Sequence, residues 1–101
     1  MENCKKIVKL ILPAVRLAVT RKAAAKGISQ VKIAKYLGIA QAEVSKYLSG
    51  NVSNHIKELA NKVASSEKQI DEIVDTIENT GDEEAVSKKI DALCAELGNS
   101  L

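Results

Sequence analysis

Apolar residues recur at helical spacing along most of the chain, and runs that alternate apolar and polar residues, as strands do, are absent. Because an amphipathic helix places residues three and four apart on one face, this pattern predicts an all-α protein. The only proline, Pro13, fits the first position of an N-terminal helix over 13–26 that stops at Gly27. Residues 5–12 fit either an earlier helical turn kinked at Pro13 or an extended arm. Their apolar content predicts that they pack, with a second subunit as one candidate surface.

The segment 29–49 holds two short helical patterns separated by a glycine. The first pattern covers 29–36, with Ser29 in the position of an N-cap. The second covers 41–48 and carries polar and small residues at its exposed positions. Gly38 lies between the patterns, and a glycine can adopt positive φ at low cost. Two short helices joined by a tight glycine turn cross steeply, as in a DNA-binding helix-turn-helix.

The apolar residues of this segment match the interior of such a unit. They are Ile33, Leu37, Ile39, Val44 and either Tyr47 or Leu48. Ala34 is small where the second helix passes closely over the first. The alternative is an ordinary αα-hairpin, which explains the apolar residues but not the polar second helix that opens on Gln41.

Further helices are expected after the motif, each with its own capping signal. Ser53 caps one helix, and residues 66–69, which read Ser-Glu-Lys-Gln, resemble a capping box that begins another ending before Gly81. Asp82 caps a last helix that Gly98 ends.

The break between the first two of these helices is ambiguous. Ile56, Val63, Ile70 and Ile77 are seven residues apart, so one long helix over 53–79 fits the pattern equally well.

Charge divides the chain. Residues 1–50 hold eight Lys and two Arg against two Glu, a net charge of +8, and residues 51–101 hold five Lys against eleven acidic residues, a net charge of −6. A basic half that carries the motif suits a polyanion, whereas an acidic half avoids DNA and suits a protein partner. We therefore assign residues 1–65 to a DNA-binding domain and 66–101 to a helical extension for dimerisation or partner binding.

Several function classes are not indicated by the sequence. The apolar stretch 7–19 is too short to span a membrane and contains charged residues, so we expect a cytoplasmic protein. Cys4 and Cys94 are isolated, and His55 is the only histidine, so neither a metal site nor a cofactor is expected. Cys94 is read as a small buried hydrophobe. No base or nucleophile stands with an orienting partner, so we do not expect an enzyme.

Residues 13–65 resemble the λ-repressor/Cro-like (XRE-type) helix-turn-helix family, and they are most similar to its small archaeal regulators. The residues that carry the resemblance are Gln30, Ile33, Ala34, Leu37, Gly38, Ile39, Val44, Ser45 and Tyr47. The resemblance implies a λ-repressor-like bundle of four to five helices with additional C-terminal helices. Two departures stand out: Ala40 replaces the usual hydroxyl cap, and Glu43 puts an acid close to DNA.

The resemblance also implies a set of DNA-binding residues. These are Gln30, Lys32, Gln41, Ala42, Ser45, Lys46, Ser49 and Asn51. Gln30 would bond a phosphate and brace Gln41, which would read a base edge, since a glutamine amide can bond adenine in two places. Ala42 would touch a thymine methyl, and Lys46 a guanine or a phosphate.

Two functions are therefore carried forward. The first is a sequence-specific transcription regulator that binds double-stranded DNA as a homodimer, with its recognition helix over 41–48 in the major groove. The apolar stripes within 52–97 are its expected dimerisation surface. The alternative is an antitoxin-like or adaptor protein that binds a protein partner through its acidic C-terminal helices, which would leave an apolar face exposed on 70–97.

Overall fold

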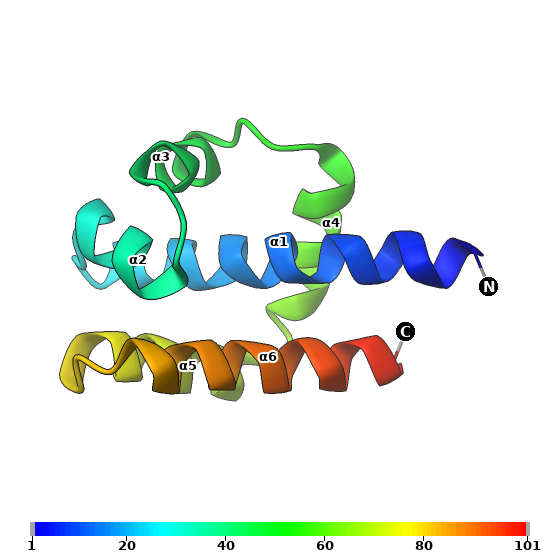
Figure 1. Ribbon diagram of the computed structural model, residues 1–101. Coiled ribbons are helices and arrows are strands. Elements are labelled where there is room, and N and C mark those ends of the chain that lie inside the picture. Colours follow the sequence, from blue (N-terminus) through cyan, green and yellow to red (C-terminus); the bar gives the residue numbers. More distant parts are fainter. Residues whose placement is uncertain (1, 101) are drawn as a thin grey trace.

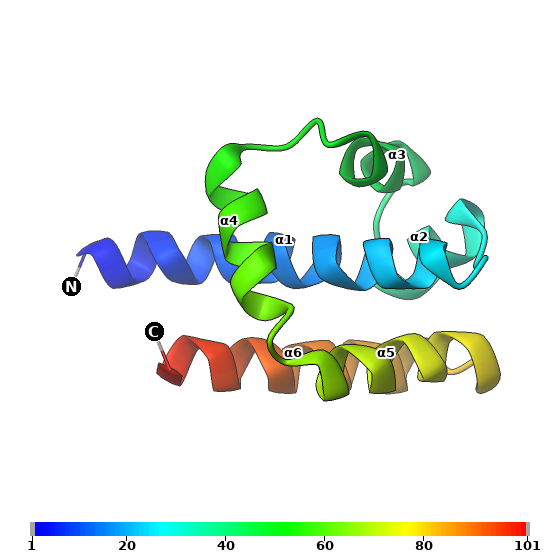
Figure 2. The ribbon, with the colours of Figure 1, turned by 180° about the vertical axis from the view of Figure 1, so that it is seen from behind.

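The computed structural model describes residues 2–100, with side chains described for residues 9–99. This part of the chain is entirely helical outside its loops, which confirms the all-α class. Its helices are α1 (Glu2–Ala25), α2 (Gln30–Leu37), α3 (Gln41–Ser49), α4 (Asn54–Val63), α5 (Glu67–Asn79) and α6 (Glu83–Ser100). In Figure 1, α3 lies above the long helix α1, and the antiparallel pair α5 and α6 lies below it. The view from behind in Figure 2 shows α4 crossing α1 steeply.

α1 begins well before Pro13 and continues through it, so the prediction that this proline opens the helix is wrong. The extended arm is wrong too, because residues 5–12 are helical. A proline inside a helix removes one backbone hydrogen bond and is costly. Packing offsets that cost: Ile11 is 2% exposed, and Leu10 and Leu12 pack half-buried against the core. The side chains of residues 5–8 lie outside the described ones.

α4 and α5 are separate helices, so the single helix over 53–79 is wrong. The chain turns at residues 64–66, and the Ser65 hydroxyl donates to the carbonyl of Lys62 at 2.7 Å, at the end of α4. The sevenfold spacing persists across the turn because both helices bury an apolar face. Val63 on α4 and Ile70 on α5 are both almost fully buried.

Most capping predictions are confirmed. The hydroxyls of Ser29 and Ser53 accept from backbone N–H groups three residues on, and the Asp82 carboxylate accepts from the N–H of Ala85 at 3.1 Å. The capping box is wrong, because the Ser66 side chain makes no cap hydrogen bond at the start of α5. The stop at Gly98 is also wrong: this glycine lies inside α6, beside Ile11 of α1.

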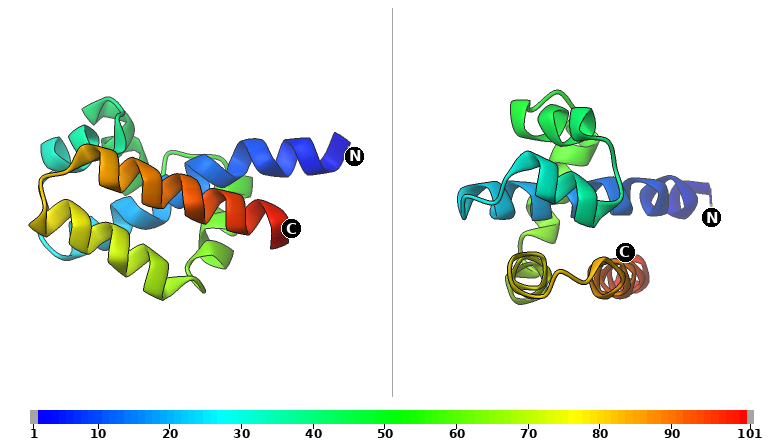
Figure 3. Two further views of the ribbon diagram at one scale, coloured as in Figure 1. Left: turned by 60° about the horizontal axis from the view of Figure 1, so that its bottom comes forward. Right: turned by 60° about the vertical axis from the view of Figure 1, so that its left-hand side comes forward.

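The apolar stripes of α5 and α6 belong to the chain's own core. They are Ile70, Ile73, Val74, Ile77, Val86, Ile90 and Leu93, each at most 5% exposed. α1 packs against both helices, and α2 packs against α6; Figure 3 shows α5 and α6 side by side beneath α1. These stripes are therefore not available as the dimerisation surface that the sequence suggested. The apolar face that the adaptor hypothesis required on 70–97 is likewise covered, except that Cys94 and Leu97 are half-buried.

Candidate nucleic-acid interface

The α2–α3 unit is built by local signals and a shared interior. Gly38 ends α2 in the left-handed region, at φ +67°, and the turn delivers the chain to α3 at Gln41. Ile33 and Val44 are fully buried between the helices and α1. Tyr47 is 8% exposed whereas Leu48 is 37% exposed, so Tyr47 is the second inward residue of α3.

The opposite face of α3 is exposed. It carries the five residues selected from the sequence, namely Gln41, Ala42, Ser45, Lys46 and Ser49. Helical spacing gathers them on one continuous strip, since residues three and four apart are neighbours on a helix. The same spacing places Glu43 on the flank beside Tyr47. The strip itself therefore contains one cation and no acid.

One hydrogen bond joins this strip to α2. The Ser45 hydroxyl donates to the side-chain oxygen of Gln30 at 2.7 Å. The resemblance implied that Gln30 braces Gln41; in the structure its partner is instead Ser45, one helical turn further along α3. The relative rotation of the two helices decides which residue meets Gln30, and spacing alone does not show that rotation.

The other selected residues are placed differently. Asn51 is exposed in the loop after α3, and its N–H donates to the carbonyl of Lys46 at 3.0 Å. Lys32 is separate from the strip: its ammonium donates to the carbonyl of Glu78, near the end of α5, at 3.5 Å. A cation at a helix C-terminus is favourable there. The structure therefore does not bring Lys32 together with the other seven residues.

The sequence analysis did not select Lys57, which lies close to the end of α3. Its ammonium is 3.7 Å from the point where a Cβ on Gly50 would stand. No spacing rule relates a residue early in α4 to the cap of α3, so only the fold brings them together. Lys57 adds a second cation, after Lys46, at this end of α3.

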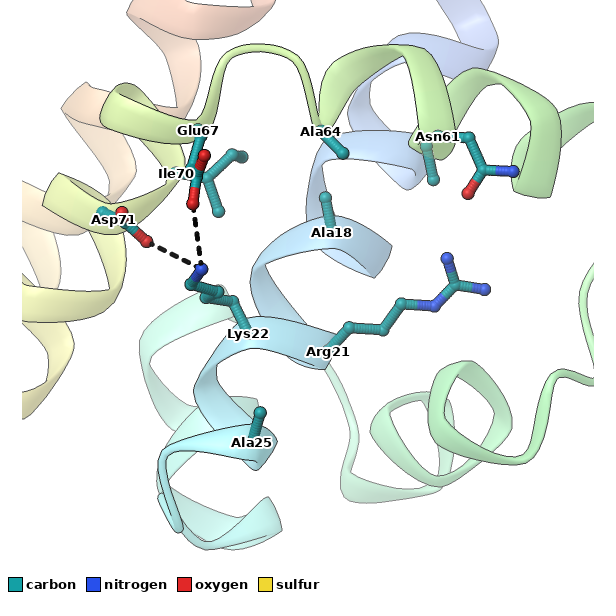
Figure 4. Close-up of a pocket in the computed structure, with 10 residues that line it drawn as sticks. Ala18, Arg21, Lys22, Ala25, Asn61, Ala64, Glu67, Ile70 and Asp71 are labelled. Atoms are coloured by element: carbon teal, nitrogen blue, oxygen red, sulfur yellow. Dashed lines mark ion pairs between the residues drawn. The ribbon is translucent and has the colours of Figure 1, made fainter.

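Some basic residues of the first half of the chain form ion pairs with acidic residues of the second half. Lys22 of α1 pairs with Glu67 and Asp71 of α5 at 3.6 and 3.4 Å, as Figure 4 shows. Lys26 pairs with Asp75 at 3.0 Å, and this hydrogen bond raises the pKa of Lys26. On the side of α1 away from α3, one lysine in the last turn of α1 and one in the turn after it therefore pair with three acidic residues of α5.

A hollow of about 330 Å³ lies beside these ion pairs, between α1, α4 and α5 (Figure 4). Its apolar wall is formed mainly by alanines, and Arg21 and Asn61 stand at its edge. Among the described side chains, no three His, Cys, Asp or Glu residues gather as a metal ion would require.

Two further side chains have pKa values that burial raises. Cys94 is half-buried, and loss of water contact raises the pKa of its thiol, which keeps it protonated and unreactive. Burial likewise raises the pKa of Tyr47. The side chain of Cys4 lies outside the described ones.

Comparisons with protein-family models, with curated proteins and with solved structures return no match. Among the described residues, every helix is too short or too polar to cross a membrane.

Proposed function

We propose that this protein is a sequence-specific transcription regulator of the λ-repressor/Cro-like type, acting in the cytoplasm as a homodimer. α3 enters the major groove of double-stranded DNA, and the protein has no enzymatic activity of its own. The observation that carries the proposal is the exposed strip of α3. The opposite face of this helix is anchored in the core by the buried residues Val44 and Tyr47. A helix of this kind fits the major groove, where each base pair presents a distinct pattern of donors and acceptors.

Each residue of the strip has a suitable chemistry. Gln41, in the first turn of α3, can bond the N6 and N7 atoms of adenine together, and the methyl group of Ala42 can contact a thymine methyl. Lys46 can bond guanine, while Lys57 and the amide of Gln30 can bond phosphates. Phosphate contacts supply affinity and base contacts supply sequence preference.

Homodimer formation follows from the size of the strip. One short recognition helix reads only a few base pairs, and two-fold pairing doubles the site with half-sites about one helical turn apart. The apolar stripes of α5 and α6 are buried within the chain, so they do not form the contact between the two subunits. Their burial also counts against a partner protein held by an apolar face on 70–97.

Substitution of Gln41 tests the proposal. On the operator selected by the wild-type chain, Gln41→Ala is expected to weaken binding by about 1–3 kcal/mol, with little change on scrambled DNA. Gln69→Ala on α5, the same chemical change away from α3, is the matched control and keeps wild-type affinity. Unchanged affinities of Gln41→Ala for both DNAs would show that α3 is not the reading helix.

A further inference from the structure

The hydrogen bond between Ser45 and Gln30 limits what Ser45 can offer to DNA. A serine hydroxyl has one hydrogen and two lone pairs. That hydrogen is directed at the Gln30 oxygen over 2.7 Å, and both residues are exposed on the α2–α3 surface. The Ser45 oxygen can therefore only accept a hydrogen bond from a group that approaches from solvent.

In the major groove, the hydrogen-bond donors and acceptors of the bases are different atoms. Adenine N6 and cytosine N4 are amino donors, whereas purine N7, guanine O6 and thymine O4 are acceptors. A serine that is free to rotate can bond either class. A serine whose hydrogen is already engaged can bond only the amino groups.

We propose that Gln30 fixes the polarity of Ser45, so that Ser45 reads an exocyclic amino group, adenine N6 or cytosine N4, and no base acceptor. This inference rests on the proposed function. Gln30 is then a positioning residue as well as a phosphate contact: its oxygen holds Ser45, and its NH₂ group keeps two donors for a phosphate.

The first step of the test locates the base pair that Ser45 reads. Operators are selected from a random duplex library with the wild-type chain and with Ser45→Ala, and the pair whose preference is lost in the variant is the one that Ser45 reads. Synthetic operators then change single atoms at that pair. Nebularine in place of adenine, or 2-pyrimidinone in place of cytosine, removes the amino group, and a 7-deazapurine removes the N7 acceptor.

The wild-type chain is expected to lose about threefold to tenfold in affinity when the amino group is removed, the loss typical of one hydrogen bond. The affinity of the wild-type chain is expected to stay unchanged when the N7 acceptor is removed. Removing the amino group also weakens base pairing in the duplex, so the same DNAs are measured with Ser45→Ala as a control. The affinity of this variant is expected to change only by the amount that weaker base pairing causes, and not on removal of N7.

Two substitutions of Gln30 separate positioning from phosphate contact. Gln30→Glu keeps an oxygen that accepts from Ser45, so sensitivity to the amino group persists while affinity for every sequence falls. Gln30→Ala frees the hydroxyl to rotate, so sensitivity to the amino group drops below that of the wild type and acceptor bases are tolerated at that position. Both side chains are exposed, so the variants retain the fold.

Three outcomes overturn the inference and leave the proposed function standing. They are a wild-type loss on removing N7, full sensitivity to the amino group in Gln30→Ala, and an unchanged preference in Ser45→Ala. A wild-type chain that enriches no sequence overturns the proposed function, and the inference with it.

Discussion

Replacing Ile77 with alanine tests whether α5 is part of the folding unit that holds α3. Ile77 is fully buried on α5, in one core with α1, α2 and α6. The substitution removes three carbon atoms, and at about 0.8 kcal/mol for each the loss is about 2.4 kcal/mol before any cavity is counted. With the cavity, the free energy of unfolding should fall by about 2–5 kcal/mol. That is a large share of the roughly 5–15 kcal/mol that stabilises a small domain.

The assay exploits the aromatic composition. The chain has no Trp and two Tyr, Tyr36 and Tyr47, so in a Tyr36→Phe background the fluorescence of Tyr47 reports on α3 alone. Urea unfolding is followed by this signal and by helical circular dichroism, at one protein concentration because dimers are stabilised by mass action. Both transitions of Ile77→Ala should shift together to lower urea, while the exposed control Glu72→Ala stays near wild type.

An unshifted Tyr47 transition in Ile77→Ala, with an early loss of part of the helical signal, would refute this reasoning. The segment 66–101 would then unfold as a separate appendage, as the sequence-based division at residue 65 allows.

Three more predictions concern a buried hydroxyl, two glycines and two titrating side chains. Thr20 is fully buried, and its hydroxyl has no hydrogen-bond partner among the described residues; Thr20→Val should therefore raise the free energy of unfolding by about 1 kcal/mol, and a lower urea midpoint would speak against an unpaired hydroxyl. Gly38 has positive φ and nothing within 4 Å of an added Cβ, so Gly38→Ala should cost about 1–2 kcal/mol through backbone strain alone. Gly98→Ala, inside α6, should instead stabilise by about 0.5–1 kcal/mol, and equal effects of the two in thermal melts would contradict this. The pKa of Lys26 is raised by its hydrogen bond to Asp75, and that of Tyr47 by burial. Both groups contribute stability that is complete below their ordinary pKa values of 10.5 and 10.0 and is lost as pH rises through the folded values. Stability should fall on the alkaline side, less steeply in Tyr47→Phe; an identical pH profile for this variant would contradict the role of Tyr47.

The sequence predicts well those features of the fold that depend on a few neighbouring residues. Ser29 and Asp82 cap helices as expected, because a cap needs only a side-chain oxygen and a backbone N–H three residues on. The sequence does not predict the break at residues 64–66, because the sevenfold spacing is compatible with both a continuous and a broken helix. The sequence predicts that Pro13 opens a helix, but Pro13 lies inside α1, because tertiary packing of Ile11 and its neighbours keeps the preceding segment helical.

The candidate site shows the same division. Helical periodicity places Gln41 and Ser45 on one exposed strip, and the structure agrees. The sequence does not predict contacts between separate helices, such as the hydrogen bond from Ser45 to Gln30 and that from Lys32 to the carbonyl of Glu78 near the end of α5. These contacts depend on the rotation and docking of whole helices, which are set by the core as a whole.

The most direct test of the central claim is selection of bound DNA from a random duplex library, with affinity for the enriched sequences then measured across salt concentrations. The proposed function predicts an enriched motif of two related half-sites and an affinity that falls steeply as salt rises, because phosphate contacts release counterions. Weak binding with no enriched sequence would contradict it.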